Sequence, residues 1–116
     1  MDHFKSEWDI EMTEIRKTVH SNEGIAFSNH VTKERMSERE VNMIDIAYSF
    51  MTGQIYEGYD IGQYPKYRNP DPLRTIVGKD SNGEYLTVGV ALKSDGTFRV
   101  TTVYRGVTDR LKHFFE

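Results

Sequence analysis

Cysteine is absent from this chain of 116 residues. That absence excludes disulfide bonds, thiolate metal ligands and a cysteine nucleophile. Long hydrophobic runs are absent too, since none approaches the roughly 20 apolar residues that a membrane helix needs. The first ten residues contain no apolar signal-peptide core. We therefore expect a cytoplasmic protein that has no contact with a membrane.

Motifs for cofactors and metals are also missing. No glycine-rich phosphate loop precedes a helix, and no Gly-x-Ser-x-Gly nucleophile elbow occurs. His30 and Glu34 lie four residues apart, a spacing that suits two metal ligands on a helix, but a third ligand in register is lacking. We expect neither a cofactor nor a metal site.

The charge is divided unevenly along the chain. Residues 1–61 contain six Lys and Arg against twelve Asp and Glu, whereas residues 62–116 contain nine against six. Nearby charges dominate within a Debye length of about 8 Å, so the basic half could bind phosphates although the whole chain has a net charge of -3. The alternative is a solvated helical face beside an ordinary sheet.

An apolar stripe with helical spacing occupies the first twenty residues. Its members recur three or four positions apart and are Phe4, Trp8, Met12, Ile15 and Val19. A turn-rich cluster at residues 21–24 should end this helix. The length suits one domain over residues 1–116, in which residues 1–24 form a helical extension and residues 107–116 a short closing helix.

Two further helices are predicted before Gly53. A short one covers residues 29–36, and a capping box of Ser37 and Glu40 starts a longer one that runs to about Met51. Gly53 is a natural stop for it. Its buried side is expected to carry Val41, Ile44, Tyr48 and Met51, widened by Met43, Ala47 and Phe50.

After Gly53 the pattern changes to strands and tight turns. The ranges that favour strands are 54–59, 73–79, 84–93 and 97–105. A proline-rich loop separates the first two, and glycine-containing turns separate the others. Helices followed by antiparallel strands predict an α+β fold, with two or three N-terminal helices packed on a three- to four-stranded antiparallel sheet.

Strand alternation predicts the sheet face that is turned away from the helices. The residues expected on the helix side are Leu86, Val88, Val90, Leu92, Phe98, Val100, Thr102 and Tyr104. Those expected on the exposed face are Arg74, Tyr85, Thr87, Arg99, Thr101 and Arg105. Guanidinium groups match phosphate oxygens and aromatic rings stack on bases, so this face is a candidate RNA-binding surface. The alternative is an ordinary solvent-facing sheet.

A second pattern runs through the middle of the chain: Ser-x-His, Arg-Met-x-x-Arg, a helix, a glycine, an acidic strand and a final Thr-Val-Tyr strand. Its residues are Ser28, His30, Arg35, Met36, Arg39, Gly53, Glu57, Thr102, Val103 and Tyr104. Over residues 25–106 the chain thereby resembles the domain-of-unknown-function family 4258. That family usually has a glycine directly after the second arginine, where this chain has Glu40, so we expect its helix junction to differ.

The resemblance implies a layout similar to that of the RelE/ParE toxins and other small ribonucleases that need no metal ion. Members of the family occur in small bacterial and phage proteins and as C-terminal modules of toxins. By this resemblance, His30, Arg35 and Arg39 are candidate catalytic residues, and Thr102 or Tyr104 is a candidate partner.

The chemistry of RNA cleavage fits these residue types. A histidine titrates near neutral pH and can transfer a proton, arginines can hold the phosphate, and a tyrosine can donate a proton or stack. Each residue also has a structural alternative. His30 could begin a helix, the two arginines could pair with nearby carboxylates, and Tyr104 could belong to the core.

Two functions follow from the sequence. One is a RelE-like RNA-binding protein that acts as a metal-independent toxin-type endoribonuclease on RNA or ribosome-associated RNA and is held by an antitoxin. The other is a non-catalytic phage or mobile-element module that binds and inhibits a host protein. The acidic outer face expected for the first helix favours the second, as does Glu40; its residues are Glu7, Asp9, Glu11 and Glu14.

Overall fold

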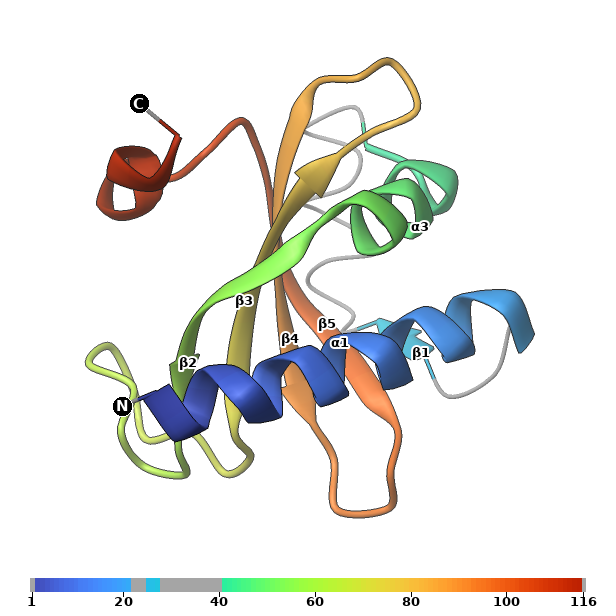
Figure 1. Cartoon of the computed structure of the whole chain (residues 1–116). Helices are drawn as coiled ribbons and strands as arrows, with labels where there is room; N and C mark the ends of the chain where they lie inside the picture. The colour runs from blue at the N-terminus through green and yellow to red at the C-terminus, as the bar shows by residue number, and fades with distance from the viewer. Residues whose placement is uncertain (1, 22–24, 28–40, 116) are drawn as a thin grey trace.

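Five strands form one twisted sheet in the computed structural model, which describes residues 2–21, 25–27 and 41–115 (Figure 1). The strands are β1 (Ile25–Phe27), β2 (Gln54–Tyr59), β3 (Leu73–Lys79), β4 (Tyr85–Leu92) and β5 (Phe98–Arg105). Their order across the sheet is β1-β5-β4-β3-β2. Strands β2 to β5 are antiparallel, as predicted, whereas the short β1 was not predicted and lies parallel to β5.

Helices α1 (Asp2–Ser21) and α3 (Met43–Thr52) cover one face of this sheet (Figure 1). The α+β fold predicted from the sequence is therefore confirmed. The core lies between these helices and the sheet, and its fully buried members include Met12, Ile15, Ile46, Phe50, Ile76, Leu86, Val88, Val90, Val100 and Val103. The chain ends in the 3₁₀ helix η2 (Asp109–Phe114), which confirms the short closing helix.

Helix α1 follows the predicted stripe. Met12 and Ile15 are buried, while Trp8 and Val19 are partly buried and pack against the core. The helix ends at Ser21, as predicted. Arg16 joins it to α3, because its guanidinium donates hydrogen bonds to the backbone oxygens of Phe50 (3.2 Å) and Gly53 (2.7 Å). These two bonds satisfy carbonyl groups that the end of α3 leaves without helical partners.

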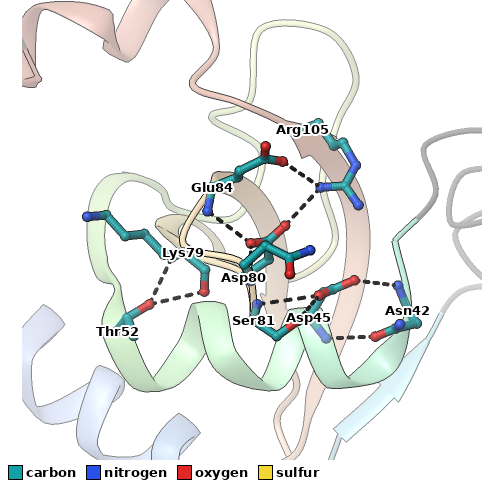
Figure 2. Close-up of polar contacts among 9 residues, drawn as sticks. Asn42, Asp45, Thr52, Lys79, Asp80, Ser81, Glu84 and Arg105 are labelled. Carbon is teal, nitrogen blue, oxygen red and sulfur yellow. Dashed lines mark hydrogen bonds and ion pairs between the residues drawn. The ribbon is translucent and has the colours of Figure 1, made fainter.

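The start predicted for α3 is wrong. The helix begins at Met43, with Asn42 as its N-cap. The side-chain oxygen of Asn42 accepts a hydrogen bond from the Asp45 amide (2.9 Å), and the Asp45 carboxylate accepts one from the Asn42 amide (3.2 Å) (Figure 2). This capping box replaces the one expected at Ser37 and Glu40, which lie outside the described residues, as does the short helix predicted over 29–36.

The predicted buried side of α3 is also wrong in part. Val41 and Phe50 are buried as predicted, together with Asp45, Ile46 and Ser49. Four other apolar side chains that were expected inside are exposed; these are Met43, Ile44, Tyr48 and Met51. The cause is a close backbone contact, because a Cβ atom at Gly78 would lie only 2.0 Å from the Ser49 oxygen. Apolar residues surround most of α3, and this contact determines which of them face the sheet.

A β-bulge changes the alternation along β5. Gly89 pairs with Thr102 and Val90 with Val100, so Thr101 is an extra residue on β5. The side chains after Thr101 therefore face opposite to the prediction. Val103 enters the core, and Tyr104 lies on the face away from the helices. The prediction that Thr102 and Tyr104 share a face with Val100 is wrong for this reason.

Candidate functional site

The sheet face opposite α1 and α3 holds a pocket of about 760 Å³. This volume lies within the range of roughly 300–1,000 Å³ that is usual for ligand sites. Short side chains of the central strands line its floor; they are Thr75, Thr87, Gly89, Thr101 and Thr102. The β2–β3 loop forms one wall with Tyr64, Lys66 and Tyr67, and the segment Val107–Arg110 forms another. We call this the open-face pocket.

Small residues give the floor its depth. Gly89 pairs with Thr102, and a Cβ atom at Gly89 would lie 2.5 Å from the Thr102 methyl carbon. The Thr87 hydroxyl donates a hydrogen bond to the Gly106 oxygen (2.8 Å), and the Thr101 hydroxyl donates one to the Gly89 oxygen (3.3 Å). The floor is thus a layer of threonines in which some hydroxyl groups also hold the strands and the turn after β5.

The tyrosine wall lies on a loop that is held by one buried asparagine. The Asn69 side chain donates to the backbone oxygens of Asp60 (2.9 Å) and Asp71 (2.7 Å) and accepts from the Tyr64 amide (3.0 Å). Tyr64 contacts Tyr67 edge to face at 5.0 Å. Asn69 is fully buried. The loop is therefore a fixed structure although it has no helix or strand.

The opposite wall is tied to the sheet by an ion pair. Arg110 donates two hydrogen bonds to the Glu57 carboxylate (2.7 and 2.8 Å), and Thr75 donates another (3.0 Å). Burial raises the pKa of Glu57, but the bonds from Arg110 and Thr75 and the charge of Arg110 outweigh burial, so its pKa is below the ordinary value. The bonds to Glu57 raise the pKa of Arg110. Both groups are thus charged at neutral pH.

Arg74 does not lie on the exposed face as predicted. It pairs with Val90 in the sheet register and therefore shares the helix-covered face. Its guanidinium donates to both carboxylate oxygens of Glu11 on α1 (2.7 and 3.1 Å), and Arg74 is only 6% exposed. Glu11 accordingly points to the sheet instead of joining an acidic outer face of α1.

Arg105 was also predicted on the exposed face and does not lie there. It pairs with Leu86, on the helix side, and its guanidinium lies 2.9 Å from Asp80 and 3.7 Å from Glu84 (Figure 2). A hydrogen bond from the Glu84 amide is the largest cause that lowers the pKa of Asp80, and Arg105 adds to it. Arg105 contributes to the pocket lining, but its charge is matched by carboxylates.

The other predicted surface residues lie on the open face with different surroundings. Thr87 and Thr101 line the pocket, whereas Arg99 is exposed on the same face and is not among the lining residues. The Tyr85 ring contacts Phe115 at 5.0 Å. Tyr104 lines the pocket and is 37% exposed, so it is not a core residue.

The remaining predicted catalytic residues cannot be placed in this site. His30, Arg35 and Arg39 lie outside the described residues. Sequence reasoning missed Asn69, Glu57 as the partner of Arg110, and the tyrosine wall. The run Tyr64-Pro-Lys-Tyr67 was a signal for that wall, because two aromatic residues and a lysine stand together in a loop.

Comparison with known protein families finds one family that matches most of the chain. The family described as Domain of unknown function (DUF4258) matches residues 27–105. The chain belongs to this family. The DUF4258 match contains strands β2 to β5 and the pocket floor, whereas α1 and the wall Val107–Arg110 lie outside it.

Two other comparisons find nothing: no curated protein and no solved structure matches the chain. Among the helices within residues 2–21 and 41–115, none has the length and apolar character required to cross a membrane.

Proposed function

We propose that this DUF4258 protein binds single-stranded RNA in the open-face pocket and cleaves it without a metal ion, as a RelE-like toxin-type ribonuclease of the cytoplasm. The observation that carries the proposal is the composition of the pocket. Tyrosine rings, a lysine and a layer of hydroxyl groups line one concave surface. Aromatic rings stack on bases, cations bind phosphates, and hydroxyl groups can bond to the ribose.

Each group has a role in the proposed reaction. Tyr104, at the end of the pocket near η2, donates a proton to the leaving oxygen or orients the phosphate. His30 removes the proton of the 2′-hydroxyl, and Arg35 and Arg39 stabilise the charge that develops on the phosphate. The roles of His30 and the two arginines rest on the family motif, and the role of Tyr104 rests on the motif and on its position in the pocket.

The test is RNA cleavage by the purified protein in excess EDTA. Wild type should cut total bacterial RNA, His30→Ala should be inactive, and Tyr104→Phe should lose roughly 10²-fold or more, as expected for a proton donor. Tyr48→Phe is the matched control, because Tyr48 is an exposed tyrosine on α3 away from the pocket. Cleavage that survives His30→Ala in a folded protein would show that the catalytic assignment is wrong.

A second candidate function is supported by α3. Four large apolar side chains of this helix are exposed, namely Met43, Ile44, Tyr48 and Met51. An apolar patch on a helix is a common feature of surfaces that bind proteins. In this case the chain is an interaction module that binds and inhibits a host protein, and an antitoxin could use the same patch.

Salt dependence separates the two candidates. RNA affinity should fall steeply between low and moderate salt, because phosphate binding releases counterions. Affinity for a protein held by apolar area should change little over the same range. Wild type that neither binds nor cuts RNA would leave the interaction module as the better explanation.

A further inference from the structure

We infer that Tyr67, supported by Tyr64 and flanked by Lys66, is a subsite for one unpaired nucleobase and its phosphate. This inference rests on the proposed RNA binding and identifies a part of the open-face pocket that binds without taking part in cleavage. The residues lie together on the β2–β3 loop, outside any helix or strand (Figure 1). They were not among the residues predicted from the sequence.

The geometry of the rings is that of a stacking platform. Tyr67 is 52% exposed, yet it is held from behind by Tyr64, whose ring centroid is 5.0 Å away at an interplanar angle of 69°. Tyr64 in turn contacts Tyr59 of β2 at 5.1 Å. The three rings form a continuous row from the sheet to the solvent. A base that stacks on Tyr67 would therefore meet a supported ring and not a free side chain.

The platform is ordered before any ligand binds. The buried Asn69 joins three backbone groups of the loop, and the Gly62 amide donates to the Asn69 oxygen (2.9 Å). Gly62 has a φ angle of 73°, which favours glycine, and Pro65 lies within the tyrosine run while Pro70 follows it. A rigid surface loses little conformational entropy on binding, so most of the stacking energy remains available for affinity.

Lys66 is the cation best suited to a phosphate here. The other three cationic residues that the pocket-lining strands and η2 bring to the pocket are bound to carboxylates: Arg74 to Glu11 and Arg105 to Asp80 on the helix-covered side of their strands, and Arg110 to Glu57. Within the described part of the chain, Lys66 has no carboxylate partner. The nearby Asp71 of the same loop is paired with Lys93 at 2.8 Å. The positive charge of Lys66 is thus available beside the exposed ring.

The subsite is separated from Tyr104 along the sheet. Tyr59, behind the tyrosine wall, pairs with Leu73, whereas Tyr104 lies level with Thr87 and Val77. Four residues of β3 span about 13 Å at roughly 3.3 Å per residue. A base on Tyr67 therefore belongs to a different nucleotide from the one at Tyr104. Loss of the Tyr67 ring should therefore weaken RNA binding and raise KM, while kcat changes little.

The experiment measures binding of a short fluorescent single-stranded RNA by anisotropy. Tyr67→Ala should weaken binding about tenfold, within the range seen when a stacking ring is removed, and Tyr67→Phe should retain wild-type affinity. Ile10→Ala, which removes an exposed apolar side chain of α1, is the control and should have no effect. Lys66→Ala should reduce the salt dependence of the RNA affinity by about the amount expected for one lost phosphate contact. Lys17→Ala on α1 should leave this salt dependence unchanged.

The outcomes separate this inference from the proposed function. RNA binding by wild type with unchanged affinity in Tyr67→Ala would overturn the subsite and leave the proposed function standing. A loss of affinity for fully paired RNA equal to the loss for single strands would also overturn it, because paired bases cannot stack on the ring. Failure of wild type to bind any RNA would instead contradict the proposed function itself.

Discussion

The two faces of the sheet are made by the same strands but differ in every property that matters for function. On the face under α1 and α3, strands β3, β4 and β5 place branched apolar side chains that are almost completely buried, such as Ile76, Val88 and Val103. On the other face, many of the intervening positions that line the pocket are threonine, glycine and tyrosine. The difference indicates that the helix-covered face provides most of the stability of the fold, while the exposed positions of the other face can change at small cost and are available to bind a ligand.

The largest test of this comparison removes one ring from the core under α3 and one ring from the open face. Phe50→Ala should lower the free energy of unfolding by about 3–5 kcal/mol, because Phe50 is only 1% exposed and a cavity would remain. Tyr104→Ala on the open face should cost under about 1 kcal/mol. Urea unfolding of the two variants measures both values. Similar losses would show that the open face also supports the core.

A pair of glycines makes a finer comparison. Gly78→Ala places a Cβ atom 2.0 Å from the Ser49 backbone oxygen, whereas Gly89→Ala places one 2.5 Å from a Thr102 methyl carbon. Backbone atoms of α3 cannot move without shifting the helix, but a threonine side chain can rotate into the pocket. We expect a loss of about 1–3 kcal/mol for Gly78→Ala and a clearly smaller one for Gly89→Ala.

Thermal unfolding of the two glycine variants measures this difference. Thr102→Ser in the Gly89→Ala background should recover part of the loss, since it removes the methyl group that the new Cβ atom meets. A larger loss for Gly89→Ala than for Gly78→Ala would mean that the pocket floor is the less adaptable of the two faces.

The fold could be predicted where the signals are local. The bounds of β2 and β3 agree with the ranges predicted from alternation and from the flanking glycine and prolines. Helix α1 follows from one apolar stripe. The face of α3 could not be predicted, because apolar residues lie nearly all round it and the contact with Gly78 decides among them. The bulge at Thr101 likewise depends on pairing with β4, which the sequence of β5 alone does not contain.

The candidate site was harder to predict than the fold for the same reason. Threonines on β4 and β5 were assigned to the open face from alternation, and Thr87 lies there. The walls depend on partners far apart in the chain, since Glu57 and Arg110 are 53 residues apart. Arg74 and Glu11 are 63 residues apart, and their ion pair moves an arginine from the predicted surface to the covered face. Charge patterns along a sequence do not reveal such pairs.

The smallest expected effect concerns the ion pair that ties the wall Val107–Arg110 to the open face. Glu57→Gln should cost no more than about 1 kcal/mol at neutral pH, because the Arg110 side chain is 45% exposed and solvent screens the pair. Arg110→Gln should cost a similar amount, and the double variant should lose less than the sum of the two, since both changes break one interaction.

The direction of the Glu57 pKa shift predicts the pH range in which this ion pair stabilises the fold. The pKa of Glu57 is lower in the folded protein than its ordinary value of 4.5, so the carboxylate stabilises the fold above that pH. Its contribution is lost as the pH falls below 4.5 and through the folded pKa, and the stabilities of wild type and Glu57→Gln should then converge. Urea unfolding at several pH values measures the gap. A gap that stayed constant down to pH values well below 4.5 would mean that the ionised pair does not hold the wall, and that the wall is fixed by the buried Leu111 and the C-terminal phenylalanines instead.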